Sequence, residues 1–295
     1  MHLSPLSPPF VRGGLVLALG VVSLSWAAIL IRLTAAPAVT VAAWRMALSA
    51  AVVLTLLGAR RTRLPPRGMG FAVVAGAFLA LHFVLWIESL RHTTVASSVA
   101  LVTTNPIFVG LLSAVVLAER PSRVLWQGIG LSVMGGLLIG WGDFAVGGTA
   151  LLGDVLALLG AVAASAYLLI GRRARSEGSF LPYVGVAYGT AAVLLLAGAA
   201  ATGQFVPAGG EWLWIALMAL GPQLLGHTSV NWALRRFSAS AVAVAILGEP
   251  VGATLWAYAV FGEVPGPTQG IGIALVLLGI VRALRGPRPY ATIDP

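Results

Sequence analysis

Three polar side chains in the apolar stretch 212–232 are spaced four residues apart: Gln223, His227 and Asn231. In an α-helix, residues i, i+4 and i+8 lie on one face, so these side chains form a polar stripe. Polar groups within a bilayer are costly against lipid, and each is a candidate functional group. We expect the stripe to line a substrate cavity, with hydrogen bonding to a neighbouring helix as the alternative.

His82 and Trp86 share a helical face by the same spacing, in the stretch 69–89. An imidazole in a cavity can donate to a carboxylate, accept from an amine or carry a proton. We therefore expect this pair to contact substrate. The alternative is a neutral histidine whose ring is hydrogen-bonded to a backbone carbonyl.

Two prolines each follow a polar residue inside an apolar stretch, as Asn105-Pro106 and Glu249-Pro250. Proline removes a helix hydrogen bond and can kink the helix, and irregular backbone at membrane depth is tolerated where it lines a polar cavity. Glu249 lies near the middle of its stretch and is the candidate partner for a proton or an ammonium group. The alternative is a structural ion pair with Arg45, an arginine deep in its own stretch.

Aromatic residues also fall deep within the apolar stretches, among them Trp26, Trp86 and Tyr167. We expect them to form a π-rich cavity wall, with plain packing as the alternative. The full set of expected substrate-binding residues is His82, Trp86, Asn105, Tyr167, Gln223, His227, Asn231, Glu249 and Trp26.

The composition indicates the kind of protein that positions these groups. The 295 residues are 59% hydrophobic and 9% charged, with a mean hydropathy of +0.96, whereas soluble domains carry about 25% charged residues. Too few polar side chains are present to cover a water-soluble fold. The sequence therefore predicts an all-α polytopic membrane protein, with about 20 residues in each spanning helix.

Ten apolar stretches account for nearly the whole chain. They lie near 11–31, 38–58, 69–89, 95–117, 124–141, 153–170, 181–201, 212–232, 239–261 and 268–284. The first is long and has an internal counterpart, so we interpret it as a retained helix rather than a signal peptide.

The basic residues predict the orientation of these stretches. All 18 are arginine, and most fall in alternate connections, which the positive-inside rule places in the cytoplasm. This pattern predicts ten spans with both termini inside, in a bacterial-type cytoplasmic (inner) membrane with lipid as partner. Small groups of arginine between apolar stretches are not a nucleic-acid-binding face, so we expect no nucleic-acid partner.

The two halves of the chain are related to each other. Residues 90–108 realign with 234–252, matching Pro106 to Pro250, and the Gln-Gly-Ile-Gly at 127–130 matches that at 269–272. The repeats are 1–142 and 150–295. Because each holds an odd number of spans, the second enters the membrane inverted, an arrangement typical of secondary transporters with a midplane site between the halves.

These residues resemble the EamA repeats of the drug/metabolite transporter (DMT) superfamily over nearly the whole chain. The most specific parts are the small-residue-rich fourth and ninth spans, each ending in Glu-x-Pro (119–121 and 263–265), followed by Gln-Gly-Ile-Gly. The resemblance implies ten helices, a central cavity and export of small metabolites. Within the family the chain is similar to YddG-type aromatic amino-acid exporters.

The residues exclude several other functions. There is no cysteine, no Gly-x-Ser-x-Gly and no His-Glu-x-x-His, so we expect neither an enzyme nor a metal or cofactor site. One deep arginine and no lysine argue against a phosphorylated substrate. We expect export of amino acids, aromatic or neutral, by alternating access, and leave proton coupling open. The alternatives are a multidrug or other metabolite/proton exchanger of the same fold, and a channel or membrane signalling protein.

Overall fold

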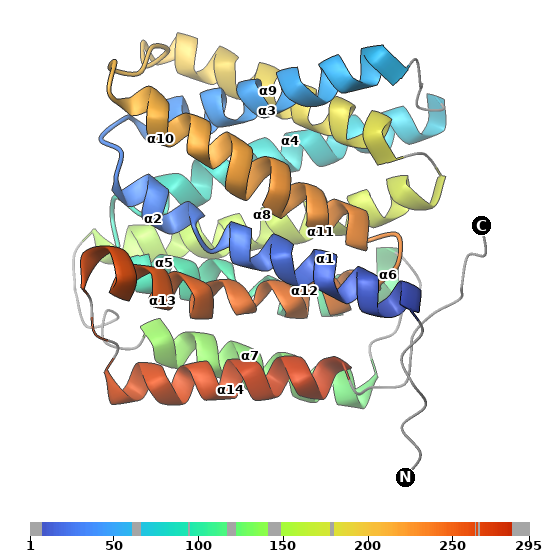
Figure 1. Ribbon diagram of the computed structural model, residues 1–295, viewed down its shortest axis with the longest axis vertical. Coiled ribbons are helices and arrows are strands. Elements are labelled where there is room, and N and C mark those ends of the chain that lie inside the picture. The colour runs from blue at the N-terminus through green and yellow to red at the C-terminus, as the bar shows by residue number, and fades with distance from the viewer. Residues whose placement is uncertain are drawn as a thin grey trace.

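The computed structural model describes residues 8–60, 66–93, 95–116, 122–140, 149–177, 180–262, 264 and 266–284. Within these ranges every regular element is a helix, and the helices run side by side as one bundle (Figure 1). Seven helical stretches of the described residues are long and apolar enough to cross a membrane. The expectation of an all-α membrane protein is confirmed for this part of the chain.

Long unbroken helices form the frame of the bundle. Two of them begin at a proline, Pro66 and Pro267, a residue suited to the first turn because its missing N–H has no partner there anyway. The unbroken helices are α3 (Ala38–Arg60), α4 (Pro66–Ser89), α7 (Arg123–Gly140), α8 (Ala150–Glu177), α9 (Phe180–Ala201) and α14 (Pro267–Leu284).

Of the remaining four apolar stretches, three are interrupted and one changes its helical pitch. The first divides into α1 (Pro8–Leu24) and α2 (Ala27–Arg32), the fourth into α5 (Val95–Val102) and α6 (Asn105–Val116), and the ninth into α12 (Ala239–Ile246) and α13 (Gly248–Phe261). The eighth is continuous but changes pitch, from α10 (Glu211–Met218) through the π-helical segment η2 (Ala219–His227) to α11 (Thr228–Ala233).

Prolines explain three of these irregularities. Pro106 and Pro250 lack the N–H groups that would bond to the carbonyls of Val102 and Ile246, the last residues of α5 and α12. Pro222 lies inside η2, and a π-helical turn is one way to absorb a residue that cannot donate. The expected kinks at Pro106 and Pro250 are therefore present as breaks.

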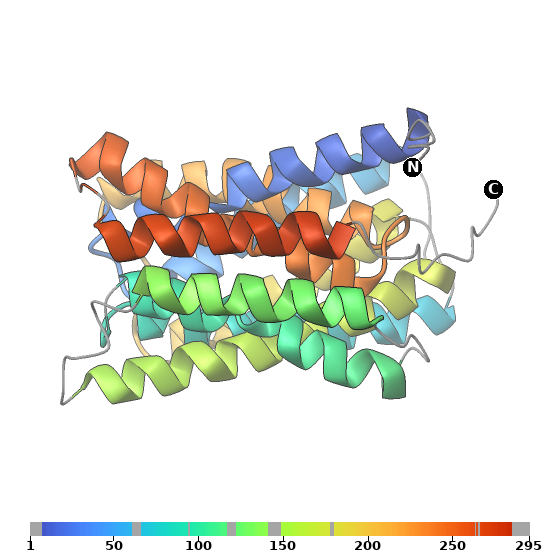
Figure 2. The same cartoon turned by 90° about the horizontal axis from the view of Figure 1, so that it is seen from below.

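Helices from the two halves of the chain pack against each other in antiparallel pairs. Helix α3 lies along α9, α4 along α8, and α7 along α14, while α1 lies along η2 and α11. Figure 2 shows α7 and α14 side by side at one edge of the bundle. These two approach closely because Gly128 and Gly135 meet α14 where Gly279 and Gly272 leave room for backbone contact.

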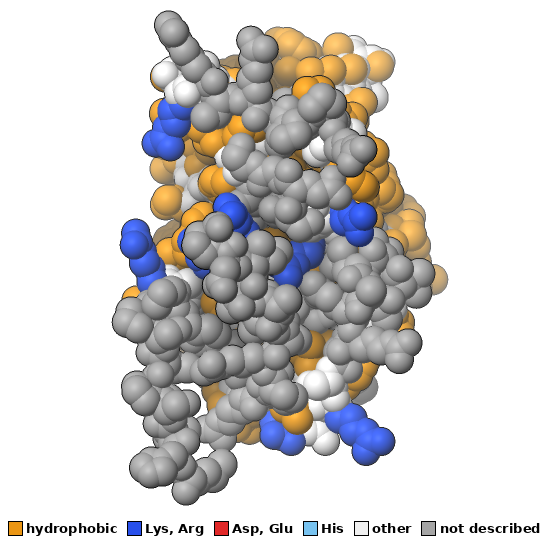
Figure 3. Space-filling view, turned by 90° about the vertical axis from the view of Figure 1, so that its right-hand side faces the viewer, with side chains coloured by type: hydrophobic (Ala, Val, Ile, Leu, Met, Phe, Trp, Pro, Cys, Tyr) orange, Lys and Arg blue, Asp and Glu red, His pale blue; other side chains and the backbone are white. Residues whose placement is uncertain are grey.

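The described arginines outside the bundle's core gather mainly at one end. Figure 3 looks onto that end, where basic side chains are visible at several places across the face. Their positions are Arg12, Arg60, Arg123, Arg172, Arg173, Arg235, Arg236 and Arg282, at the ends of α1, α3, α7, α8, α11 and α14.

The opposite end of the bundle carries Arg32 and Arg91 together with Glu88 and Glu211. The separation of charge expected from the sequence is thus present in the described part of the chain. The Glu-x-Pro positions 119–121, 263 and 265 lie outside the described residues.

Candidate functional site

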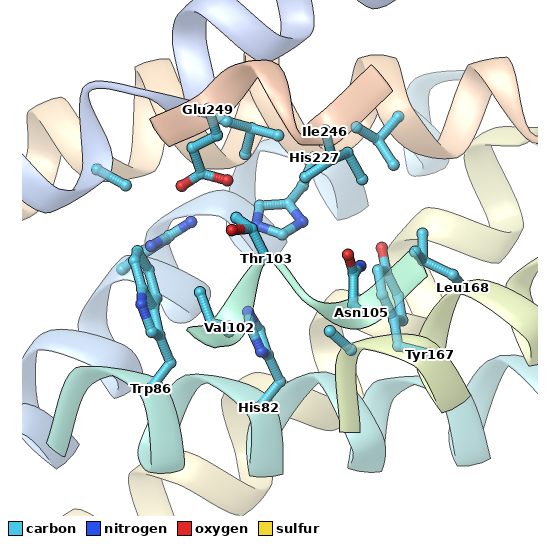
Figure 4. Close-up of a pocket in the computed structure, with 15 residues that line it drawn as sticks. His82, Trp86, Val102, Thr103, Asn105, Tyr167, Leu168, His227, Ile246 and Glu249 are labelled. Atoms are coloured by element: carbon cyan, nitrogen blue, oxygen red, sulfur yellow. The ribbon is translucent and has the colours of Figure 1, made fainter. Parts of the chain in front are cut away.

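The interrupted helices surround a cavity near the middle of the bundle. Its volume is about 50 Å³, and Figure 4 shows polar side chains from opposite walls pointing into it. The lining residues are Leu24, Ala27, Arg45, His82, Trp86, Val102, Thr103, Asn105, Ala164, Tyr167, Leu168, His227, Val230, Ile246 and Glu249.

The helix breaks place residues at this cavity. Asn105 begins α6 and Glu249 lies in the first turn of α13, so each sits beside the backbone interruption that its proline causes. Leu24 and Ala27 flank the break between α1 and α2 in the same way. At these three breaks the irregular backbone lies beside the cavity, where it is tolerated at membrane depth.

Arg45 of α3 is fully buried and is held on two sides. Its Nε donates to Oε1 of Gln223 at 3.1 Å, and its guanidinium lies 4.2 Å from the centroid of the Phe83 ring. Both terminal nitrogens, Nη1 and Nη2, are buried without a hydrogen-bond partner. The site thus holds a positively charged group with two free donor nitrogens.

Glu249 supplies the opposite charge from α13. Its side chain is 9% exposed, and in Figure 4 its carboxylate points into the cavity from the wall opposite His82 and Trp86. No ion pair within 4.0 Å joins Glu249 to Arg45 in the described residues. The direct ion pair that we considered from the sequence is therefore not formed, and both side chains line the cavity wall.

Asn105 lies on the same cavity and is 4% exposed. Its Oδ1 is buried without a partner, while its backbone carbonyl accepts a hydrogen bond from Ser165 Oγ of α8 at 3.2 Å. The side-chain carbonyl oxygen of Asn105 is therefore a further unsatisfied polar atom at this site.

His82 and Trp86 of α4 form one wall of the cavity. Their rings are parallel within 6°, with centroids 5.9 Å apart. His82 Nδ1 lies 3.0 Å from the carbonyl oxygen of Gly160; because that oxygen can only accept, Nδ1 carries the proton. This is the contact expected of a structural neutral histidine, and it leaves Nε2 of the same ring for the cavity. Trp86 Nε1 is buried without a partner.

The polar stripe Gln223–His227–Asn231 faces the interior of the bundle, but its members divide between two roles. His227 lines the cavity and meets Phe83 edge-on at 5.3 Å. Gln223 and Asn231 lie behind the wall, where Gln223 holds Arg45 and the Asn231 amide donates to the Tyr167 hydroxyl. The wider π-helical turn in η2 takes the stripe out of the regular α-helical register.

Trp26 is the expected site residue that the structure places elsewhere. It packs against Trp256 with centroids 4.3 Å apart, and it lines a separate groove of about 270 Å³ between α1 and η2, beside the exposed Leu217 and Leu220. The other expected residues line the cavity or, as with Gln223 and Asn231, contact a side chain that does.

Sequence reasoning did not place Arg45 among the binding residues. Its position as an arginine inside an apolar stretch was the available signal, and we interpreted it as a possible partner of Glu249. Apolar lining residues such as Val102 and Ile246 cannot be distinguished from other apolar residues in a sequence that is mostly apolar. Among the described residues, no group of three or more His, Asp or Glu side chains is placed to hold a metal ion.

The chain is similar to known transporters along almost all of its length. The EamA-like transporter family matches residues 11–141 and again residues 151–285. A transporter of Bacillus subtilis, YyaM, is 28% identical over 257 residues, which cover 82% of this chain and 83% of YyaM. The pseudopaline exporter CntI of Pseudomonas aeruginosa is 26% identical over 254 residues, which cover 84% of this chain and 87% of CntI.

The fold matches a solved crystal structure as well. The TM-score is 0.77 at 20% identity, over 92% of this chain and 97% of the other.

Proposed function

The chain belongs to the EamA-like transporter family of multi-pass membrane proteins, and from this premise we propose that it exports small amphipathic metabolites by alternating access around the central cavity. Amino acids, aromatic or neutral, are the proposed substrates. The proposed location is a bacterial-type inner membrane, and the proposed topology is ten spans in two inverted repeats, 1–142 and 150–295, with both termini in the cytoplasm.

The observation that carries the substrate proposal is the separation of two opposite charges on one cavity. Arg45 and Glu249 both line it, yet they form no ion pair within 4.0 Å. A buried charged group that is not fully hydrogen-bonded and directly paired is costly. A ligand with a carboxylate and an ammonium group would satisfy both residues, and the rings of Trp86 and Tyr167 would contact its apolar part.

The size of the cavity supports movement during transport. About 50 Å³ holds a few water molecules at most, whereas ligand pockets typically measure about 300–1,000 Å³. An amino acid therefore needs the walls to separate before it can bind. The breaks at α1–α2, α5–α6 and α12–α13 lie beside the cavity and are places where half-helices can rotate.

A second hollow lies toward one end of the bundle. It has a volume of about 300 Å³ at the end that carries Arg32 and Arg91, and its wall includes Ala28 and Ile87. In the sequence these two residues follow Ala27 and Trp86, which line the central cavity. We propose that this hollow is the external vestibule, because the opposite end carries most of the described arginines.

The experiment that tests this function is flux in liposomes. Purified protein is reconstituted, and radiolabelled phenylalanine and threonine are followed with and without a pH gradient. The proposal predicts saturable flux that is lost in His227→Ala and Glu249→Gln. Flux that ignores the gradient would identify a facilitator and remove proton coupling, and no protein-dependent flux of either compound would reject amino acids as substrates.

A further inference from the structure

The surroundings of the Arg45 side chain indicate one role for it in ligand binding. Three features support this role: the side chain is fully buried, it lines the cavity, and two of its three guanidinium nitrogens have no hydrogen-bond partner. We propose that Arg45 is the carboxylate-binding residue of the transporter and that the substrate must carry a carboxylate. This inference rests on the proposed function and names the chemical group that the site selects.

The surroundings of Arg45 fix the direction from which a carboxylate can approach. The ring of Phe83 covers one face of the guanidinium at 4.2 Å. Gln223 Oε1 occupies the Nε edge at 3.1 Å. A carboxylate can bind an arginine through two parallel N–H···O bonds, and the pair of nitrogens that remains here is Nη1 and Nη2. The bound carboxylate therefore meets the end of the guanidinium.

The contacts that hold Arg45 come from both halves of the chain. Phe83 belongs to α4, whereas Gln223 belongs to η2. A movement of one half against the other would change the contact between Arg45 Nε and Gln223 Oε1, and with it the direction in which Nη1 and Nη2 point. Carboxylate binding is thereby linked to the arrangement of the two halves, which an alternating-access carrier requires.

Burial of the Arg45 nitrogens Nη1 and Nη2 makes the site selective for ligands that carry a matching hydrogen-bond acceptor. A donor left without a partner in a water-poor site costs free energy, so a ligand that lacks the matching acceptor binds poorly. An amine without a carboxylate would satisfy Glu249 and leave Arg45 unpaired. The described cavity contains a single guanidinium, so a carboxylate of one negative charge matches it better than a phosphate dianion.

The test compares the binding of three related compounds to the purified full-length protein in nanodiscs. They are phenylalanine, phenethylamine, which lacks the carboxylate, and 3-phenylpropionate, which lacks the amine. The wild type should bind phenylalanine at least about 30-fold more tightly than phenethylamine, a ratio typical of removing one partner of a buried charged pair. In Arg45→Gln this preference should disappear through loss of phenylalanine affinity.

Two further variants separate loss of binding from loss of folding. Arg45→Lys keeps the positive charge but lacks the planar guanidinium group. It should restore less than half of the lost preference for phenylalanine over phenethylamine, measured as the logarithm of the affinity ratio. Arg123→Gln, an exposed arginine at the start of α7, is the matched control and should bind as the wild type does. Each variant is first checked for a single monodisperse peak and a cooperative thermal transition.

The outcomes distinguish this proposal from the proposed function. If phenylalanine is bound and transported but Arg45→Gln keeps the wild-type preference, the carboxylate role of Arg45 is wrong and amino-acid export stands. If the wild type binds none of the three compounds, amino-acid export is rejected. The role of Arg45 is then decided by comparing Tm in acetate with Tm in chloride at equal ionic strength. Acetate should raise Tm in the wild type and should have no such effect in Arg45→Gln.

Discussion

Asn105 and Glu249 occupy equivalent positions in the two halves of the chain and line the same cavity from α6 and α13. Each directly precedes the proline at which its span is broken. The duplicated helix break therefore presents an amide on one side of the cavity and a carboxylate on the other. The two related halves thus differ in charge at this pair of positions, so the two sides of the cavity are chemically different.

The carboxylate of Glu249 should be needed for substrates that carry an amine. Glu249→Gln keeps the shape and removes the charge, and we expect kcat/KM for phenylalanine to fall by at least about 30-fold, because truncating one side of a buried charged contact typically costs 2–5 kcal/mol or more. Flux in liposomes measures this. The control is Glu88→Gln, a partly exposed carboxylate beside Arg91 and His92. Equal loss in both variants would contradict a specific role for Glu249.

The hydrogen bond between Asn231 and Tyr167 should stabilise the fold. Tyr167→Phe removes the hydroxyl that accepts from the Asn231 amide, and leaves a buried donor unsatisfied. We expect a loss of about 0.6–2 kcal/mol of stability, given the modest average for hydrogen bonds inside membranes and the cost of a buried orphan donor. A lowered Tm in detergent would show it. Tyr258→Phe, at an exposed tyrosine, should leave Tm unchanged, and an equal drop there would reject the interpretation.

The close approach of α7 and α14 should not tolerate a side chain at Gly135. A Cβ there would lie 2.5 Å from the carbonyl oxygen of Gly272, so Gly135→Ala forces the two helices apart and should cost about 1–3 kcal/mol. Gly130→Ala in the same helix meets nothing within 4 Å and is the control. Thermal unfolding in detergent compares the two, and a Gly135 variant as stable as the Gly130 variant would mean that the helices are not packed this closely.

The proposed topology can be mapped by labelling single introduced cysteines, because the chain has no cysteine of its own that would react. Ser122→Cys lies just before α7 at the arginine-rich end, and Thr202→Cys lies just after α9 at the opposite end. An impermeant maleimide added to intact cells should label Thr202→Cys and should reach Ser122→Cys after the membrane is opened. The reverse pattern would place the termini outside.

The sequence predicted the breaks and the polar cavity because both depend on local chemistry. Proline cannot donate in a helix wherever it occurs, so the interruptions after Asn105-Pro106 and Glu249-Pro250 follow from residue identity. The face of His82 and Trp86, and the inward direction of the stripe through His227, follow from helical spacing and the cost of exposing polar groups to lipid.

Other features depend on contacts between distant parts of the chain, which spacing alone does not show. Trp26, like Trp86, lies within an apolar stretch of the sequence, but it packs against Trp256 and does not line the cavity. The role of Arg45 depends on Gln223 and Phe83, which lie on two other helices. Gln223 contacts Arg45 and Asn231 contacts Tyr167, so of the three regularly spaced residues His227 lines the cavity.

The most direct test of alternating access at this cavity is exchange across the membrane. Liposomes with the purified protein are preloaded with unlabelled phenylalanine, and the entry of external labelled phenylalanine is compared with entry into empty liposomes. Preloading should accelerate entry several-fold in the wild type, because a loaded carrier returns faster than an empty one, and should have no effect in Glu249→Gln. Rapid entry that preloading does not change, and that does not saturate, would contradict a carrier and indicate a channel.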